Sequence, residues 1–318
     1  MSVFIGIDVS KASLDVVSLP DNQHLQVANT ADGHQQLLDW IDRFKPVTQI
    51  ALEASGRYGE LVAQILVEHH YAVSYLNPKQ IHAFARMQLH YHKTDLQDAK
   101  LIARYCQLFQ PELYQPTAAL QRRLQQLSRR IDTLKKMRQQ ELNRLSSGIQ
   151  DPFVRQQLQT HIELLERMIA DTQQTVRDLI QSDDNLAQQA QLLTSIKGIS
   201  DTTAQLILAE IDINNFASAR QLAAYIGITP LHFQSGTSVN KHAAISKQGN
   251  SRLRAGLYMP SIVAMQHNLP CRKRAQSLRE RHKPGKLIVI AIMRKLIHQI
   301  YGILKSRIPF DPHFENSA

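Results

Sequence analysis

Four carboxylates near the N-terminus could together hold metal ions. Asp8 follows the apolar run VFIGI, and Glu53 ends a second apolar run, TQIAL. Asp95 and Asp98 are three residues apart at the start of a predicted helix, so their side chains share a face. Mg²⁺ prefers oxygen ligands and keeps some of its waters. Two such ions, about 4 Å apart, stabilise both the attacking and the leaving oxygen of a phosphoryl transfer. These residue types therefore favour metal-assisted chemistry at a phosphate.

Each of these carboxylates also has an ordinary structural explanation. Asp8 could cap the end of its strand in solvent. Asp95 could be the N-cap of its helix, with Asp98 as its capping partner and as a favourable charge near the helix N-terminus. A shared site is favoured by the order of the four residues along the chain and by the elements that carry them.

The elements around these residues predict an α/β domain. Short apolar strands are expected at 3–8, 14–19, 24–30, 48–54 and 71–77. Helices are expected at 31–44 and 58–69 and from Pro78. Three strands followed by alternating helix and strand are similar to the ribonuclease H-like arrangement, more than to a doubly wound nucleotide-binding fold. The phosphate-binding motifs GxGxxG and GxxxxGK[ST] are both absent.

Composition limits the class of protein. The 318 residues allow two or three domains, and 43% apolar and 20% charged residues are typical of a folded protein. The only two cysteines, Cys106 and Cys271, exclude a disulfide framework and a cysteine-rich zinc site, and they fit a reducing cytoplasm. No signal peptide is visible, and the longest uninterrupted apolar run, 287–293, is too short to span a bilayer, so no membrane partner is expected.

The net charge of +10 is concentrated in one segment. Residues 241–307 hold 15 of the 37 Lys and Arg but one of the 27 Asp and Glu, Glu280, which gives the segment +14. The remaining 22 basic and 26 acidic residues sum to −4. Ordinary surfaces mix both signs, so this basic block indicates a polyanion, and nucleic acid is favoured over membrane because no long amphipathic stretch with aromatic anchors is present. The predicted nucleic-acid contacts are Lys241, Lys247, Arg252, Arg254, Arg272, Lys273 and Arg274.

The middle of the chain carries two heptad seams. Leu120, Leu124, Leu127, Ile131 and Leu134 begin the first within 117–147, and the second runs over 158–179. The break at Gly148, Asp151 and Pro152 separates them. The pattern predicts a helical hairpin or a coiled-coil association arm. Spacing alone does not distinguish pairing within one chain from dimerisation.

Two further motifs lie in the C-terminal half. Residues 192–211 look like a helix-hairpin-helix, in which backbone N–H groups at a glycine turn, here Gly198, meet a DNA phosphate. Ser200 stands where that motif usually has a second glycine, and Thr202 or Thr203 could cap the following helix; an ordinary helix turn is the alternative. Pro230 opens a predicted loop that contains Ser235 and Gly236, and a Ser-Gly pair of this kind is usually only a turn.

Together these motifs resemble the transposases of a bacterial insertion-sequence family, numbered one hundred and ten, which also includes pilin-gene DNA invertases. The matching stretches cover nearly the whole chain in order: IGIDVSK, ALEASGRYGE, NPKQIHAFA, KTDLQDAKLIA, SIKGISDTTA, QLAAYIGITPLHFQSGTSV, GNSRLRAGLYMPSIVA and GKLIVIAIMRKL. The resemblance implies a RuvC-like catalytic domain at 1–115, a coiled-coil oligomerisation arm at 116–186 and a mainly α transposase domain at 187–318.

The resemblance also implies roles and partners. The family's metal-binding tetrad, which takes Mg²⁺ or Mn²⁺, matches Asp8, Glu53, Asp95 and Asp98. Its nucleophilic serine matches Ser235, with Ser238 as the alternative. Such proteins recombine donor and target DNA through a covalent phosphoserine link, guided by a structured bridge RNA. They form homodimers that assemble into homotetramers, in the bacterial cytoplasm and on the nucleoid when active.

Three alternatives stay open at this point. A metal-dependent junction nuclease would use the same tetrad with water as the nucleophile. A DNA invertase would need no RNA guide. A nucleic-acid-binding protein without activity would keep only the fold. A tyrosine recombinase is disfavoured, because no Arg, His-x-x-Arg and Tyr array is found.

Overall fold

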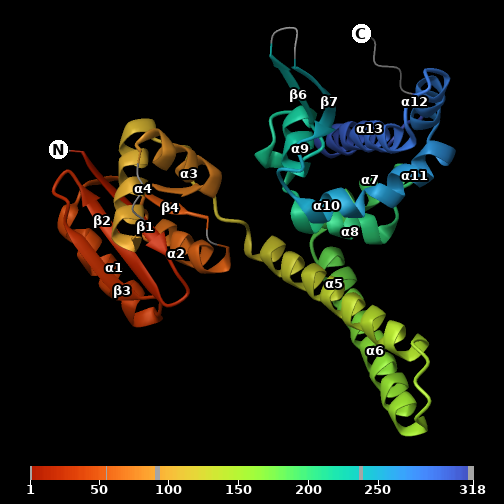
Figure 1. Ribbon diagram of the computed structural model, residues 1–318, viewed down its shortest axis with the longest axis horizontal. Coiled ribbons are helices and arrows are strands. Elements are labelled where there is room, and N and C mark those ends of the chain that lie inside the picture. The colour runs from red at the N-terminus through yellow and green to blue at the C-terminus, as the bar shows by residue number, and fades with distance from the viewer. Residues whose placement is uncertain (1, 55, 90–93, 236–238, 314–318) are drawn as a thin grey trace. The chain divides into compact units, whose positions relative to one another are not determined.

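The computed structural model divides into two compact units, Met1–Thr117 and Ala118–Ala318 (Figure 1). We call them the N-terminal unit and the helical unit. The structure describes residues 2–54, 56–89, 94–235 and 239–313, with Arg57, 231–235 and 239–244 described by their backbone alone. The chain combines a mixed sheet in the first unit with a mainly helical second unit, as predicted.

A five-stranded sheet forms the centre of the N-terminal unit, in the order β3-β2-β1-β4-β5. Its strands are β1 (Val3–Val9), β2 (Ser13–Leu19), β3 (His24–Ala28), β4 (Val47–Glu53) and β5 (Val73–Leu76). β2 is antiparallel to β1 and to β3, whereas β4 is parallel to β1 and to β5. All five predicted strands are confirmed, because each apolar run was long enough to bury a strand and was closed by turn residues.

Helices cover both faces of this sheet. α1 (Ala31–Ile41) and α2 (Arg57–Glu68) pack on the face that carries Ile5 and Ile7, with the short 3-10 helix η1 (Asp42–Phe44) following α1. α3 (Pro78–Met87) and α4 (Asp95–Phe109) pack on the face that carries Phe4 and Ala51. Side chains alternate between the two faces of a strand, so Asp8 belongs to the α4 face.

Gly6 allows α4 to lie directly against β1. A Cβ atom at Gly6 would be 2.2 Å from the backbone N of Ala103 and 2.2 Å from the backbone O of Ala99. Real atoms do not approach so closely, so only glycine permits this contact. Asp95 and Asp98 lie about one turn before Ala99 and Ala103 on the same helix. The contact therefore fixes where the first turn of α4 meets the sheet.

The helical unit begins with a hairpin of α5 (Ala119–Ser146) and α6 (Pro152–Gln181). Leu134 of α5 packs with Leu165 and Ile169 of α6, so the two predicted seams meet within one chain. An ion pair of 3.5 Å joins Arg138 to Glu166. Asp151 caps α6 by accepting a hydrogen bond from the backbone N of Val154.

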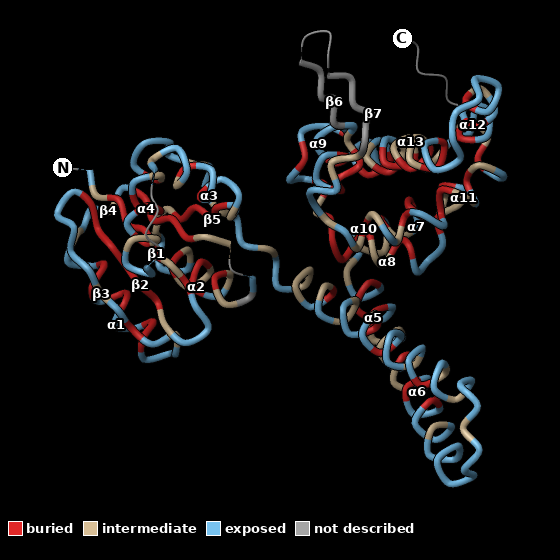
Figure 2. Tube along the Cα trace, in the orientation of Figure 1, coloured by how far each residue is buried: buried red, intermediate tan, exposed pale blue. Residues whose placement is uncertain are grey.

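The remaining helices enclose one large core. They are α7 (Asp184–Ser195), α8 (Asp201–Glu210), α9 (Ala219–Ile226), α10 (Ser251–Gly256), α11 (Tyr258–His267), α12 (Leu269–Glu280) and α13 (Gly285–Ser306), with a 3-10 turn η2 (Ile213–Asn215). The predicted apolar stripe of α13 is confirmed: Ile292, Leu296 and Ile300 are fully or almost fully buried, and Figure 2 shows the buried colour recurring along this helix.

By length and composition alone, α13 could also cross a membrane, since an 18-residue window of it has a mean hydropathy of 1.6. Half of that window is buried inside the helical unit, where the helix packs against α7, α9, α11 and α12. A core helix of a folded domain passes the same test, so packing explains this apolar stretch.

The structure corrects the loop predicted after Pro230. β6 (Pro230–Ser235) and β7 (Val239–Ile245) form a two-stranded antiparallel sheet, with Ser235 opposite Val239. Sequence patterns missed it because both strands carry several polar residues and β6 begins with proline, which is tolerated at the first position of a strand. Gly236 and Ser238 lie outside the described residues.

The close approach at Gly6 can be tested by adding one methyl group. We expect Gly6→Ala to lower the free energy of unfolding by about 1–3 kcal/mol, because the helix and strand must move apart. Urea denaturation measures this. Gly302→Ala in α13 is the matched control: no atom lies within 4 Å of the added Cβ, so stability is expected to stay equal or rise. Equal stability of Gly6→Ala and wild type would contradict the contact.

Candidate active site

Asp8 and Glu53 lie near the carboxyl ends of two neighbouring strands. β1 and β4 are parallel, and Gly6 pairs with Ala51 in their register. Asp8 and Glu53 each follow two residues later, so both side chains point to the same face of the sheet. Both residues are half-buried. Strand pairing alone thus places two carboxylates side by side on the face that α4 covers.

The first turn of α4 supplies the other two carboxylates. Thr94, and not Asp95, is the N-cap: its hydroxyl accepts a hydrogen bond from the backbone N of Gln97 at 3.3 Å. The capping role predicted for Asp95 and Asp98 is therefore wrong, because the preceding threonine already satisfies that helix end. Asp95 is exposed and Asp98 is half-buried.

Electrostatics shows that the four carboxylates share one environment. The pKa of Asp8 is raised to about 6, first by burial and then by the charges of Asp98, Asp95 and Glu53. A hydrogen bond from the backbone of Val9 acts in the opposite direction. The structure therefore brings together residues that are up to ninety positions apart in the chain. None of the described ion pairs involves Asp8, Glu53 or Asp95.

This donor set fits a hard divalent cation in chemistry. It offers carboxylate oxygens, a partly buried position and several like charges that repel one another. Within the described part of the chain, no three His, Cys, Asp or Glu side chains lie together in an arrangement that could already hold a metal ion. The four carboxylates of the Asp8 environment are therefore candidate ligands by their chemistry and their shared electrostatics, and not as a preformed site.

Asp15 is a neighbour of this site that sequence patterns did not single out. It lies opposite Asp8 in the β1–β2 ladder and is only 4% exposed. Its carboxylate accepts hydrogen bonds of 3.2 Å from Gln26 and lies 3.2 Å from His24. A charged residue inside the apolar run LDVVSL was the available signal. Unlike Asp8, this carboxylate has partners on the adjacent strand.

Ser235 belongs to the helical unit, whereas the tetrad belongs to the N-terminal unit. It is the last residue of β6 and directly precedes a segment outside the described residues, which includes Ser238. The structure describes the backbone of Ser235 and its pairing with Val239, and does not describe its side chain. A serine at a strand end is held by the backbone ladder, in contrast to the predicted loop position.

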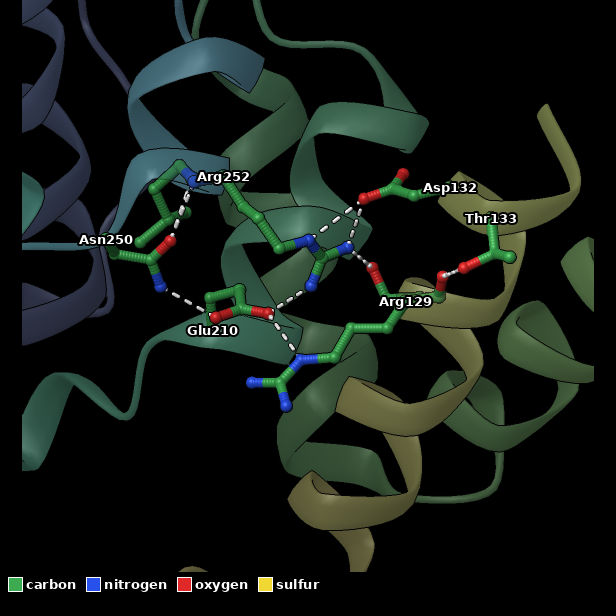
Figure 3. Close-up of polar contacts among 8 residues, drawn as sticks. Arg129, Asp132, Thr133, Glu210, Asn250 and Arg252 are labelled. Atoms are coloured by element: carbon green, nitrogen blue, oxygen red, sulfur yellow. Dashed lines mark hydrogen bonds and ion pairs between the residues drawn. The ribbon is translucent and has the colours of Figure 1, made fainter. Parts of the chain in front are cut away.

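Arg252 has partners within the fold, which sequence analysis did not foresee (Figure 3). Its guanidinium donates to Asp132 of α5 at 2.9 and 2.6 Å and to Ser128 at 3.1 Å. It also donates to Glu210, a buried carboxylate that ends α8. Asn250 donates to the same carboxylate at 2.7 Å. Arg252 is thus part of an ion-pair network that joins α5, α8 and α10.

Contacts within the fold also explain the positions of Arg254 and Gly198. Arg254 donates at 2.8 Å to the backbone O of Ile226, the last residue of α9. Gly198 has a φ of 111°, and a Cβ there would lie 3.0 Å from the Cβ of Ala264 on α11. Ser200 caps α8 by accepting from the backbone N of Thr203, so the predicted threonine cap is corrected. The positions of Arg254 and Gly198 are therefore explained by the fold without a bound phosphate.

The other predicted nucleic-acid contacts differ from these. Lys247, Arg272, Lys273 and Arg274 are exposed, and none of them takes part in the ion pairs of the described residues. Lys241 lies in β7, where only the backbone is described. The structure therefore separates cations that are neutralised inside the fold from cations that face solvent.

Comparison with known proteins decides the family. A family described as "Transposase", of the DEDD IS110 type, matches residues 5–153, and the "Transposase IS116/IS110/IS902 family" matches residues 190–276. The chain is 32% identical over 315 residues to the pilin gene-inverting protein of Moraxella bovis, and this match covers 97% of each of the two chains. The chain belongs to the IS110 transposase family. The Moraxella lacunata pilin gene-inverting protein is similar to the same extent.

A shorter match supports the same conclusion. An insertion element IS110 protein of Streptomyces coelicolor is 28% identical over 116 residues, which cover 36% of this chain and 28% of that protein. Membership in the IS110 family makes this chain an enzyme of DNA recombination, a transposase or recombinase. The matched residues 5–153 include all four carboxylates, and 190–276 include Ser235.

The raised pKa of Asp8 predicts how stability depends on pH in EDTA. Because the folded-state pKa lies above 3.8, the stabilising effect of the protonated form is complete below pH 3.8 and is lost as pH rises through about 6. Asp8→Asn cannot ionise, so we expect it to melt higher than wild type at pH 8, by roughly 2–4 °C given solvent screening of a half-exposed group. Calorimetry at pH 5 should show a smaller difference. A melting temperature for Asp8→Asn below that of wild type at pH 8 would contradict the conclusion that the ionised Asp8 carboxylate destabilises the fold.

The Arg252 network predicts a loss of stability when its cation is removed. Arg252→Met leaves Glu210 buried with the neutral Asn250 at 2.7 Å and one more distant cation, Arg129 at 3.7 Å, so we expect a loss of about 3–5 kcal/mol in urea denaturation. Lys273→Met, an exposed cation on α12, should change stability by less than about 0.5 kcal/mol. The double variant Glu210→Gln/Arg252→Met should recover part of the loss. Unchanged stability of Arg252→Met would show that the network is not structural.

Proposed function

We propose that this transposase cuts and rejoins DNA strands through a covalent phosphoserine link, with Asp8, Glu53, Asp95 and Asp98 as its metal-binding tetrad. The observation that carries the proposal is the convergence of four carboxylates on the Asp8 environment, from two strands and one helix. Such carboxylates serve phosphoryl transfer, which is the reaction that DNA recombination requires.

The fold supports a ribonuclease H-like, RuvC-like assignment of the N-terminal domain. The sheet order β3-β2-β1-β4-β5, with three antiparallel strands joined to parallel β4 and β5, agrees with the arrangement expected from sequence. We propose domain limits of 1–115 for this domain, 116–186 for a coiled-coil oligomerisation arm and 187–318 for the transposase domain. The pairing of α5 with α6 supports a hairpin in this segment, and its role in oligomerisation rests on the resemblance to the family.

The tetrad would hold Mg²⁺ or Mn²⁺. Such ions, when bound, polarise the scissile phosphate and stabilise the leaving oxygen. The fold positions these residues. Pairing between β1 and β4 fixes the backbone of Asp8 and Glu53, and the close contact at Gly6 fixes α4, which carries Asp95 and Asp98. Because the backbone that carries these carboxylates is already held by the fold, less conformational entropy is lost when they act together.

Ser235 is the proposed nucleophile. Its Oγ forms a bond to phosphorus as the P–O bond to a deoxyribose breaks, the serine gives up its proton, and the departing hydroxyl gains one. Attack by a hydroxyl of another strand then reverses the exchange and frees the serine. The number of phosphodiester-type bonds is conserved, so no ATP is needed, in agreement with the missing phosphate-loop motifs. In the proposed homodimers and homotetramers, one protomer's tetrad serves another's serine.

Donor and target DNA are the substrates, and a structured bridge RNA is the proposed guide. Base pairing with that RNA would read sequence, so the protein needs mainly phosphate contacts. Lys241, Lys247, Arg272, Lys273 and Arg274 are proposed for these contacts. Arg252 and Arg254 are left out, because their guanidinium groups are bound inside the fold. The proposed place of action is the bacterial cytoplasm, on the nucleoid.

A second candidate function is DNA inversion without an RNA guide. It is favoured by the pilin gene-inverting proteins, which match 97% of this chain. Both candidates use the same serine and the same tetrad, so they differ in partner and not in chemistry. RNA that co-purifies with the active protein would favour the guided transposase.

The covalent step predicts a trapped adduct. With end-labelled DNA and Mg²⁺ or Mn²⁺, wild type should form a protein–DNA adduct stable to denaturing gel electrophoresis. Ser235→Ala should reduce it by at least about 10³-fold, because the attacking atom is gone, and Asp8→Asn or EDTA should do the same. Ser238→Ala is the matched control and should keep the adduct.

Three results would contradict this mechanism. Cleavage by Ser235→Ala without any adduct would identify a nuclease that uses water. Adduct formation by Asp8→Asn at the wild-type rate would remove the tetrad from the reaction. Binding of DNA without cleavage by wild type, at any divalent-ion concentration, would support the non-catalytic alternative.

A further inference from the structure

A basic cavity lies between α12, α13 and the C-terminal segment of the helical unit. Its volume is about 420 Å³. Lys273 and Arg274 of α12 and Lys295 of α13 line it, together with His313. No carboxylate is among the described residues that line it. Asp311, which directly precedes Pro312 in the chain, accepts a hydrogen bond from the backbone N of His313 at 2.8 Å.

The cations of this cavity are not neutralised by the described part of the fold. None of its ion pairs includes Lys273, Arg274 or Lys295. This contrasts with Arg252, whose charge is balanced by Glu210 and Asp132. Like charges that line one cavity repel one another, so an anion bound there would stabilise the arrangement.

Positive charge continues from the cavity along α13 to α9. Burial lowers the pKa of His298, and the charges of Arg294, Arg220 and Lys295 lower it further. Lys295 also lowers the pKa of the buried Cys271 thiol, although burial has the larger and opposite effect and raises it to about 12. Lys295 therefore lines the cavity and also belongs to a group of cations around His298, with Arg294 and Arg220, which we call the basic track.

The two helices that supply the cations are fixed to each other. Asn268, fully buried at the start of α12, exchanges hydrogen bonds of 3.0 and 3.3 Å with Gln299 of α13. Its side chain also accepts from the backbone N of Cys271 at 3.2 Å and donates to the backbone O of Lys197 at 3.3 Å. Lys273 and Lys295 are thus presented by helices whose separation is set before any ligand arrives.

We propose that this cavity binds phosphodiester groups of a polynucleotide, with Lys273, Arg274 and Lys295 as the contacting cations and Arg220 and Arg294 extending the track. This inference rests on the proposed function and names one of its nucleic-acid sites. The guanidinium of Arg274 matches a phosphate in two-pronged geometry, and lysine adds point charges. Leu269, Pro270 and Pro312 give the cavity apolar walls suited to a sugar or a base.

Equilibrium binding of two triple variants tests the site. The cavity variant is Lys273→Gln/Arg274→Gln/Lys295→Gln. The matched control, Arg279→Gln/Arg281→Gln/Lys283→Gln, removes the same charge from exposed positions that do not line the cavity. The probes are a random-sequence DNA duplex and a structured RNA of equal length, each labelled and measured by fluorescence anisotropy in EDTA, so that no strand is cut.

We expect the cavity variant to bind at least about tenfold more weakly than wild type, with a salt slope shallower by about 2, and the control to lose less than about threefold. Measurements between about 50 and 200 mM salt give the slope. An effect on the DNA probe only, or on the RNA probe only, identifies which polynucleotide occupies the cavity. Equal losses in the two variants, or no loss in the cavity variant, would overturn the inference.

Lysine acetylation of wild-type protein tests the site without any substitution. Bound polynucleotide should protect Lys273 and Lys295 from acetylation, and should leave Lys283 reactive. Protection of Lys283 alone would overturn the inference. A wild-type protein that binds neither probe would overturn the proposed function itself, whereas adduct formation by wild type together with undiminished binding of the cavity variant would overturn only this site.

Discussion

The contact between α4 and β1 at Gly6 is the constraint on which the candidate active site depends. The backbone of α4 lies so close to the strand that no side chain fits between them. Closer packing of two elements leaves fewer ways for them to shift, since interiors are as dense as organic crystals. The first turn of α4 is therefore held against the ends of β1 and β4. Asp95 and Asp98 reach the environment of Asp8 as a result of this packing.

Like charges in that environment work against the stability of the fold. Burial and three neighbouring carboxylates disfavour ionisation of Asp8. The fold is therefore most stable when the negative charge of Asp8 is removed by protonation or balanced by a cation. Such local conflict between stability and chemistry is typical of functional sites, where the surrounding structure maintains an arrangement that is unfavourable by itself. Thr94 caps α4, so Asp95 and Asp98 are not needed as caps and remain available to the candidate active site.

The helical unit uses charge in two different ways. At the junction of α5, α8 and α10, the buried Glu210 is matched by Arg252, so the charges connect elements of the fold. Around α12 and α13, cations gather without described carboxylate partners. The basic block identified by composition is thus a mixture of structural and solvent-facing residues. A structural cation can be distinguished from a solvent-facing one only by its ion-pair partners, and those partners lie far away in the sequence.

The sequence by itself determined the five strands, the helices between them and the two seams of the hairpin, because apolar periodicity and turn residues are local signals. It also determined the family, through motifs spread over nearly the whole chain. It failed at β6 and β7, whose polar strands are stabilised by backbone pairing with each other and not by an apolar run.

Only the tertiary structure decided which side chains share an environment. Asp8 and Glu53 share a face because of the strand register, and the helix that carries Asp95 and Asp98 meets that face at Gly6. Arg252 is structural because Asp132 and Glu210, which are 120 and 42 residues away in the chain, lie beside it in space. Burial, electrostatic coupling and ion pairing depend on distances through space, and local sequence patterns do not contain those distances.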